Sequence, residues 1–256
     1  SMPTSLLGLS ARMQAGKTTV SKAVALEMQA LRISFGSVVA DEAEKQRLDI
    51  TREVLQDLGE SMVRADVYGF CQRVLDSKGW RKGMSIVVDG VRHKKVLLAL
   101  REMVEPDYFG LMYLNIDRET QLKRWKSEDI PYTKSLQELE QHSTEVEVLK
   151  VLPDFSDLIL DGAKNVNLIV KKIVAWSESE GFIESWSERN ERRIYLAKSL
   201  DDGSLSDDEQ KEFELLQDSF SQYLLAKFDP YKQRENPHKV RLEQIQQKLK
   251  QERRGN

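Results

Sequence analysis

Residues Ala11 to Thr19 have the types and the spacing of a phosphate-binding loop. An apolar stretch typical of a strand precedes them, and a helix-forming stretch from Val20 to Leu31 follows them. Backbone N–H groups turned inward at a helix N-terminus attract phosphate oxygens, because these donors have no intrahelical partner and the helix dipole is positive there. We predict that ATP binds to this loop, which consists of Ala11, Arg12, Met13, Gln14, Ala15, Gly16, Lys17, Thr18 and Thr19.

Three residues of the loop have individual roles in this prediction. Gly16 allows close approach of the phosphates, Lys17 bridges the β- and γ-phosphates, and the Thr18 hydroxyl ligates Mg²⁺. The first motif position is Ala11 rather than glycine, and the bulky Met13 and Gln14 stand in the middle. A chance Gly-Lys-Thr in an ordinary strand-helix turn is the alternative, but the correct flanks on both sides favour the phosphate loop.

Composition excludes several classes of protein. The chain has 256 residues, 40% of them hydrophobic, with a formal net charge of -3, so it lacks the basic excess of a dedicated nucleic-acid binder. Its one cysteine, Cys71, excludes an internal disulfide framework and fits a reducing compartment. The histidines His93, His142 and His238 lie far apart without metal spacing, and we interpret them as surface or structural residues. No stretch is long and apolar enough to span a bilayer, so we expect a cytoplasmic protein.

Short apolar runs alternate with amphipathic stretches up to residue 176, which is typical of a parallel sheet with crossover helices. The predicted fold is α/β, a P-loop NTPase three-layer sandwich with a five-stranded parallel sheet. The domain is predicted to cover residues 1–176. The predicted strands are Ser5 to Ser10, Leu31 to Phe35, Ser85 to Asp89, Leu111 to Ile116 and Leu158 to Leu160.

Residues 177–256 are predicted to form a charged helical C-terminal extension. Ser206 with Glu209 has the spacing of a capping box that opens a helix. A final helix is expected near Pro237, with Leu242, Ile245 and Leu249 on one face. These helices could form a homodimer or bind a protein partner, although packing onto the main domain is the preferred interpretation.

Several short segments together resemble the P-loop nucleoside and deoxynucleoside monophosphate kinases, a group that includes adenylate kinase and dephospho-CoA kinase. The likeness spans about residues 5 to 176, and its segments follow the order of the family. These segments are Gly8-Leu-Ser before the loop, Ser34-Phe35-Gly36, Thr51 to Gly59, Val88-Asp89-Gly90-Val91-Arg92, and Ser156 to Asp161. The resemblance implies an ATP- and Mg²⁺-dependent transferase of deoxynucleotide metabolism that phosphorylates a small nucleotide.

The resemblance also implies roles for single residues. Asp89 would hold Mg²⁺ together with Thr18, and Arg52 and Arg92 would bind the phosphate of the acceptor nucleotide, near Ser34. Structural alternatives remain open, because Asp89 could close a strand before Gly90, Arg52 could pair within its own helix, and Arg92 could be a solvated charge.

The basic helix from Asp117 to Lys126 resembles the entry to the lid of these kinases. Arg124 and Lys126 would lie over the ATP phosphates, so that Lys17, Arg92 and Arg124 form the catalytic set. The following segment is acidic, with Glu138, Glu140, Glu145 and Glu147, which argues against full catalytic competence. A solvated helix face is the alternative for these basic residues.

Two other functions fit the sequence less well. A catalytically weak nucleotide-sensing P-loop protein would signal through its helical tail, as the altered loop and the acidic lid suggest. A nucleic-acid-binding ATPase would use a basic strip near the C-terminus, but glutamate and glutamine interrupt it, which argues for a solvated face. The strip consists of Lys239, Arg241, Lys248, Lys250, Arg253 and Arg254.

Overall fold

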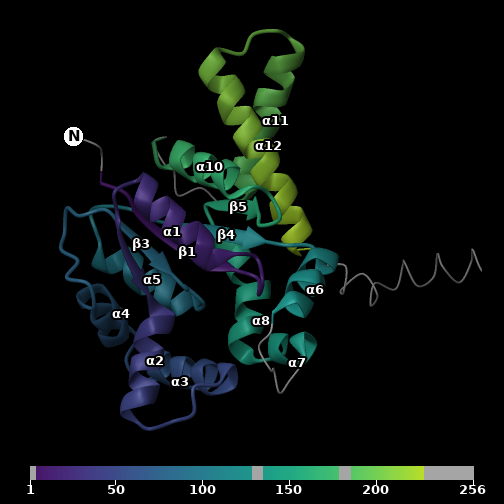
Figure 1. Ribbon diagram of the computed structural model, residues 1–256. Coiled ribbons are helices and arrows are strands. Elements are labelled where there is room, and N and C mark those ends of the chain that lie inside the picture. The colour runs from purple at the N-terminus through teal and green to yellow at the C-terminus, as the bar shows by residue number, and fades with distance from the viewer. Residues whose placement is uncertain (1–3, 129–134, 179–185, 228–256) are drawn as a thin grey trace, which may run out of the picture.

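The computed structural model describes residues 4–128, 135–178 and 186–227. Five parallel strands form one sheet at its centre (Figure 1). They are β1 (Leu6–Ala11), β2 (Leu31–Ser34), β3 (Ile86–Asp89), β4 (Phe109–Asn115) and β5 (Leu158–Asp161). Each predicted strand is therefore confirmed to within two residues. Phe35, predicted to end a strand, instead begins a helix, because the Ser34 side chain accepts a hydrogen bond from the N–H of Ser37 and caps that helix.

The strand order is β2-β3-β1-β4-β5, which puts β1 in the middle. Leu9 of β1 is in register with Asp89 of β3, and Ala11 with Leu114 of β4. Because all strands run the same way, their carboxyl ends meet at one edge of the sheet. Ligands of open parallel sheets bind at this edge, and here the edge holds the end of β1 between its two neighbours.

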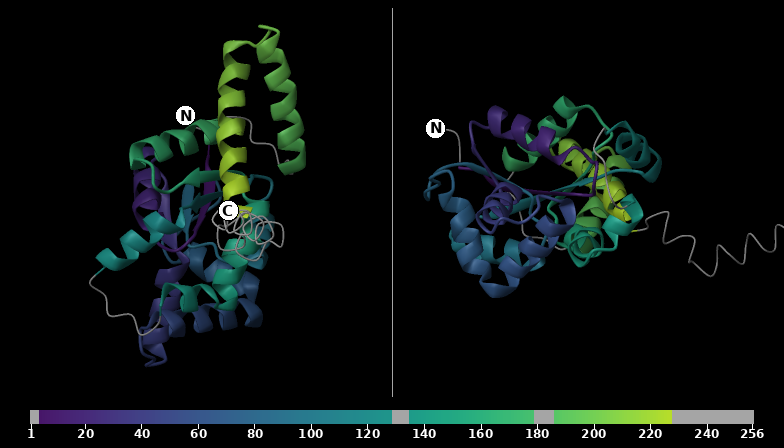
Figure 2. Two further views of the ribbon diagram at one scale, coloured as in Figure 1. Left: turned by 90° about the vertical axis from the view of Figure 1, so that its right-hand side faces the viewer. Right: turned by 60° about the horizontal axis from the view of Figure 1, so that its bottom comes forward.

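Helices cover both faces of the sheet, so the domain is a three-layer α/β sandwich of the P-loop type (Figures 1 and 2). Up to β5, the helices are α1 (Lys17–Glu27), α2 (Phe35–Lys45), α3 (Arg52–Ala65), α4 (Val67–Asp76), α5 (Lys94–Met103), α6 (Arg118–Ser127), α7 (Leu136–Glu140), α8 (Ser143–Lys150) and α9 (Leu152–Phe155). After β5 come α10 (Val166–Glu178), α11 (Trp186–Asp201) and α12 (Asp207–Lys227).

Alternating side chains on the strands build two separate cores. Leu7 and Leu9 of β1 point to the face covered by α1 and α10, where they pack with Val24 and Ile169. Alternate positions, such as Leu6, point to the opposite face and its helices α2 to α5. Both faces of each central strand are buried, and the strands are mostly apolar up to their carboxyl ends, as expected for a parallel sheet.

The predicted C-terminal helical extension is present as the hairpin of α11 and α12. The capping box at the start of α12 is confirmed, because the N–H of Glu209 donates to Ser206 Oγ over 3.3 Å and the Glu209 carboxylate accepts from the N–H of Ser206 over 3.0 Å. One end of the hairpin packs on the domain, while its tip projects away from the sheet (Figure 2). The final helix predicted near Pro237 lies outside the described residues.

Two side chains of α11 attach the hairpin to the domain. Trp186 is buried, stacks on Tyr223 of α12 with ring centroids 4.6 Å apart, and donates from Nε1 to the carbonyl of Pro153. Arg189 donates to the carbonyls of Ser156 and Asp157, at 2.8 and 2.9 Å. α11 and α12 therefore pack onto the main domain, whereas the final helix, for which this packing was the preferred interpretation, stays a prediction. The boundary between residues 176 and 177 stays a prediction.

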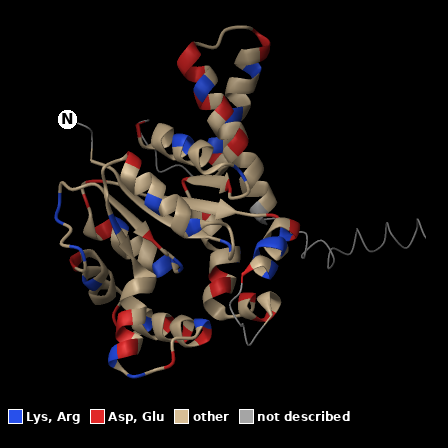
Figure 3. Cartoon of the chain, viewed as in Figure 1, with Lys and Arg blue, Asp and Glu red and all other residues tan. Residues whose placement is uncertain are grey.

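Charged side chains are mixed by sign over the helices. In the view of Figure 3, lysines and arginines alternate with acidic residues on most helices. The basic strip considered for nucleic-acid binding lies at residues 239–254, beyond the described part of the chain. None of the described helices combines the length and the apolar character that crossing a membrane requires.

Cys71 provides a test of the packed core. The thiol is fully buried, and burial raises its pKa to about 12. Because the thiolate is the reactive form, we expect a thiol-specific disulfide reagent at pH 8 to label the folded protein on the order of 1,000-fold more slowly than free cysteine. Labelling in denaturant should reach one thiol per chain. Labelling of the folded protein at the rate of free cysteine would contradict this placement.

Candidate active site

The loop between β1 and α1 has the backbone shape of an anion-binding nest. Gln14 and Gly16 are both left-handed, with φ of 70° and 88°, and the N–H of Ala15 bonds to the carbonyl of Arg12. Such alternation turns successive N–H groups toward the same side. A left-handed conformation costs a residue with a side chain roughly 1 kcal/mol, so Gln14 stores strain where a ligand would bind.

All nine predicted loop residues line one open cavity of about 610 Å³. The side chains of Arg52, Arg92 and Arg124 line it as well, together with Gly162 from the turn after β5. A cavity of this volume is within the usual range for a small-molecule site. The structure thus brings the predicted loop and three predicted arginines together around one space.

Met13, which departs from the usual loop composition, connects the loop to the following helices. Its side chain is 5% exposed and packs with Leu136 and Leu139 of α7 and with Leu122 and Trp125 of α6. The bulky residue therefore points out of the loop into a small apolar cluster, and the main chain is left to face the cavity.

Glu140 of α7 links the loop to α6 through hydrogen bonds and ion pairs. Its carboxylate accepts from Arg12 Nε over 3.3 Å, from Arg118 Nη1 over 2.8 Å and from Gln121 Nε2 over 2.7 Å. Gln121 also donates to the carbonyl of Met13 over 3.0 Å. Arg12, predicted to bind ATP, thus directs its guanidinium to α7, so any contact with phosphate comes from its main chain.

Arg124 of α6 joins the loop to the turn after β5. Its Nη1 donates to the carbonyl of Gln14 over 2.9 Å and its Nη2 to the carbonyl of Gly162 over 3.0 Å. A side chain at position 162 would meet the carbonyl oxygen of Ala15 at 2.5 Å, so the close approach of this turn to the loop requires glycine. Lys126, predicted beside Arg124, is exposed and is not part of the cavity wall.

Asp89 at the end of β3 is the centre of a buried charged cluster. It is 1% exposed, and Lys17 Nζ lies against its Oδ1. Its Oδ2 accepts from Ser21 Oγ over 2.8 Å and from Arg32 Nη2 over 2.6 Å. Burial acts to raise the pKa of the Asp89 carboxyl, but Lys17, Ser21 and Arg32 outweigh burial and hold the pKa below its usual value.

Lys17 lines the cavity while its ammonium rests on Asp89. Burial lowers the pKa of Lys17, the positive charge of Arg92 lowers it further, and Asp89 opposes both. Because burial and a nearby cation both destabilise the charged ammonium, an approaching anion stabilises it. The side chain is therefore placed to move from the carboxylate to a phosphate.

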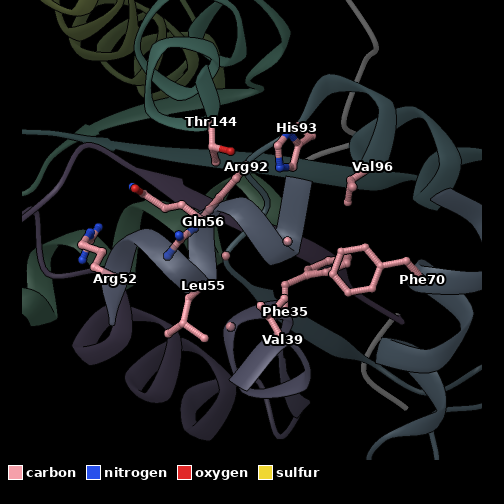
Figure 4. A pocket seen from close by; sticks show the side chains of 13 residues that line it. Phe35, Val39, Arg52, Leu55, Gln56, Phe70, Arg92, His93, Val96 and Thr144 are labelled. Atoms are coloured by element: carbon pink, nitrogen blue, oxygen red, sulfur yellow. The ribbon is translucent and has the colours of Figure 1, made fainter. Parts of the chain in front are cut away.

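A second cavity of about 280 Å³ lies beside the first and is lined mainly by apolar side chains. Arg52 and Arg92 line both cavities, and Figure 4 shows the two arginines on one side of the second cavity and Phe70 on the other. Arg52 is 3.5 Å from Glu145 Oε1, whereas Arg92 has no ion pair with another described residue. Two cavities that share two cations could hold a donor and an acceptor of a phosphoryl group.

Ser34, predicted to bind the acceptor, is not part of this wall. Its hydroxyl caps α2, and the next two residues, Phe35 and Gly36, line the cavity instead. The capping role explains the residue type without a ligand.

Four side chains of this region were not predicted as site residues from the sequence: Gln56, His93, Thr144 and Glu145. His93, interpreted as surface or structural, is 9% exposed and lines the second cavity, with its Nδ1 3.2 Å from Glu147 Oε2. The bond from His93 is the largest cause that holds the pKa of Glu147 below its usual value. His93 directly follows Arg92, and that adjacency was the available signal. Glu145 and Thr144 belong to α8, and no local pattern links α8 to α3.

No family model matches the chain, and no curated protein matches it. Solved structures that resemble it include a shikimate kinase from Aquifex aeolicus (16% identity, TM-score 0.46, covering 70% of this chain and 99% of that one). Others are a sugar kinase from Janibacter (17% identity, TM-score 0.45, 71% and 98% covered) and a gluconokinase from Sinorhizobium meliloti (14% identity, TM-score 0.44, 67% and 90% covered). The resemblance to nucleoside monophosphate kinases stays a prediction.

Glu140→Gln tests whether α7 supports the loop. The variant leaves Arg12 and Arg118 without their shared carboxylate in a largely buried place, so we expect the free energy of unfolding to fall by about 3 kcal/mol. ATP affinity should fall too, because the loop loses its outer support. Chemical denaturation and calorimetric titration measure the two effects.

Glu119→Gln is the matched control, since Glu119 forms an exposed pair with Lys123 on α6. That variant should change neither stability nor ATP affinity appreciably. Equal effects of the two substitutions would show that Glu140 has no special role.

Proposed function

We propose that the chain is an ATP- and Mg²⁺-dependent phosphotransferase whose acceptor is a nucleoside or deoxynucleoside monophosphate. The observation that carries the proposal is the pair of cavities that meet at Arg52 and Arg92, one lined by the phosphate loop and one mainly apolar. A phosphate acceptor needs its charge neutralised more than it needs a catalytic base.

On the donor side, the loop would hold the triphosphate through its main-chain N–H groups. Lys17 would leave Asp89 for the β- and γ-phosphates, and Arg32 and Ser21 would still donate hydrogen bonds to Asp89 Oδ2. Arg124, already bonded to the loop carbonyl at Gln14, has further N–H donors for charge that develops on the transferring group. These residues supply positioning and neutralisation without forming a covalent bond.

The predicted magnesium ligands differ in how well they fit. The Thr18 hydroxyl lines the donor cavity, and hydroxyl and phosphate oxygens suit Mg²⁺. Ser21 and Arg32 both bond to Asp89 Oδ2, so Oδ1, which Lys17 would leave, is the oxygen that would hold Mg²⁺ directly or through water. Bound at Thr18, the ion would neutralise charge on the β- and γ-phosphates.

On the acceptor side, Arg92 and Arg52 would bind the acceptor phosphate between the two cavities. Guanidinium groups donate parallel charge-assisted hydrogen bonds to phosphate oxygens. The body of the acceptor would lie in the second cavity against Phe35, Val39 and Leu55. An apolar cavity of about 280 Å³ matches a flat ring in size and polarity.

Lys17→Ala tests the donor site. We expect turnover to fall by on the order of 100-fold or more, because a charge that stabilises the transition state is lost. The fold should persist, since Arg32 and Ser21 still bind Asp89. Lys126→Ala, which removes an exposed charge outside the cavity, is the control and should retain activity. Unchanged ATP affinity and turnover in Lys17→Ala would exclude the phosphate-loop function.

Arg92→Ala tests the acceptor site. We expect the KM for the acceptor to rise roughly 10- to 100-fold with little change in the KM for ATP, because charge-assisted hydrogen bonds to the acceptor phosphate are lost. We prefer Arg92 to Arg52 for this test, because removing Arg52 would also leave the buried Glu145 without its positively charged partner. Equal loss of affinity for both substrates would count against separate donor and acceptor sites.

A nucleotide sensor is the second candidate, and the projecting hairpin of α11 and α12 favours it (Figure 1). The two functions separate in one experiment, in which the protein is incubated with ATP, Mg²⁺ and each common nucleoside monophosphate. A diphosphate product supports the transferase. Tight ATP binding with no product for any acceptor supports the sensor.

A further inference from the structure

The second cavity has one polar edge, and its polar atoms share a property. Thr144, His93 and Arg92 lie along one side of the cavity, opposite the apolar Phe35 and Leu55 (Figure 4). Gln56 lines the same cavity and is 2% exposed, as is Thr144. Neither Gln56 Oε1 nor Thr144 Oγ1 has a hydrogen-bond partner among the described residues. A buried polar atom without a partner costs about 1 to 3 kcal/mol, so such atoms in a cavity wall point to a ligand.

Glu145 fixes which end of the Gln56 amide is unsatisfied. The bond between Gln56 and Glu145 Oε1 is 3.0 Å long and buried. The Arg52 guanidinium, which only donates, lies 3.5 Å from the same oxygen, so this oxygen is placed to accept. The NH₂ group of Gln56 must therefore face Glu145. Its carbonyl oxygen, which only accepts, is the atom left for a ligand.

The same reasoning applies to His93. Glu147 accepts the N–H of Lys94 with one oxygen, over 2.7 Å, and contacts His93 Nδ1 with the other. Since the carboxylate accepts, Nδ1 donates to Glu147, and Nε2 is the ring nitrogen left for a ligand. No described residue bonds to Nε2. The wall thus offers a ligand the Gln56 carbonyl oxygen, which only accepts, and the Thr144 hydroxyl, which can accept or donate.

We propose that this cavity selects a ligand ring whose edge carries hydrogen-bond donors, in the simplest case an exocyclic amino group, with Gln56 as the selecting residue and Thr144 as a second hydrogen-bond partner. The inference rests on the proposed function only for the place of the ligand phosphate at Arg92. An amino group offers one N–H to the Gln56 carbonyl oxygen and one to the Thr144 hydroxyl, whereas a carbonyl at the same ring position would face the Gln56 oxygen without a hydrogen and be repelled.

Two pairs of nucleotides differ in this feature and in little else. CMP and UMP exchange an amino group for a carbonyl, and so do AMP and IMP. We expect the amino member of at least one pair to bind the full-length protein at least ten-fold more tightly in calorimetric titration without ATP. Equal affinity within both pairs, tighter binding of the carbonyl members, or no binding by any of the four would overturn the inference.

Substitution of Thr144 tests whether its hydroxyl binds the ligand. Thr144→Val removes the hydroxyl and keeps the shape, so it should lower the affinity for the amino member several-fold and raise the Tm of the ligand-free protein, because a buried unsatisfied group is gone. Thr144→Ser retains the hydroxyl and should keep the affinity. A Thr144→Val protein with unchanged affinity, or with a lower Tm, would show that the hydroxyl is already satisfied.

Gln56→Met provides an independent variant of similar length. It should reduce the preference for the amino member, whereas an equal loss of affinity for both members of a pair would mean that Gln56 only shapes the cavity. These binding measurements also separate the two proposals. Amino-selective binding without phosphoryl transfer would remove the transferase and leave this inference, and transfer without amino preference would do the opposite.

Discussion

The phosphate loop depends on support from outside the cavity. A loop can direct its N–H groups inward only if something else holds its carbonyls and side chains, since a strained turn such as that at Gln14 does not persist alone. Here Met13 is buried under α6 and α7, Arg12 is paired with Glu140, and Arg124 bonds to the carbonyl of Gln14. The main chain that faces the cavity is thus fixed by contacts on its other side.

The glutamates of the acidic lid segment have a structural role that the sequence did not indicate. In the sequence, its glutamates argued against catalytic competence. In the structure, Glu140 binds Arg12 and Arg118, Glu145 binds Arg52 and Gln56, and Glu147 binds His93. Each carboxylate holds side chains of one of the two cavities. These charges therefore orient the site, and the total charge of the segment does not describe their effect.

The fold could be predicted from sequence because its signals are local. Each strand is a continuous apolar run, the loop lies between a strand and a helix, and the capping box of α12 spans four residues. The cavity at the loop could be predicted, since all nine residues of one motif line it. The second cavity could not be predicted, because its polar atoms come from α3, from the N-cap of α5 and from α8, and only the packing of these helices brings Gln56, His93 and Thr144 together. Lys126 and Ser34 do not line either cavity although their sequence neighbours Arg124 and Phe35 do, because side chains close in sequence can point in different directions.

The short strand β5 links two parts of the molecule. Just before it, Asp157 bonds to Arg189 of the hairpin and to Arg101 of α5, and just after it Gly162 lies against the carbonyl of Ala15 in the phosphate loop. Four residues therefore separate the hairpin anchor from the loop between β1 and α1. A force applied to the hairpin at Arg189 would act at one end of a short strand whose other end contacts that loop.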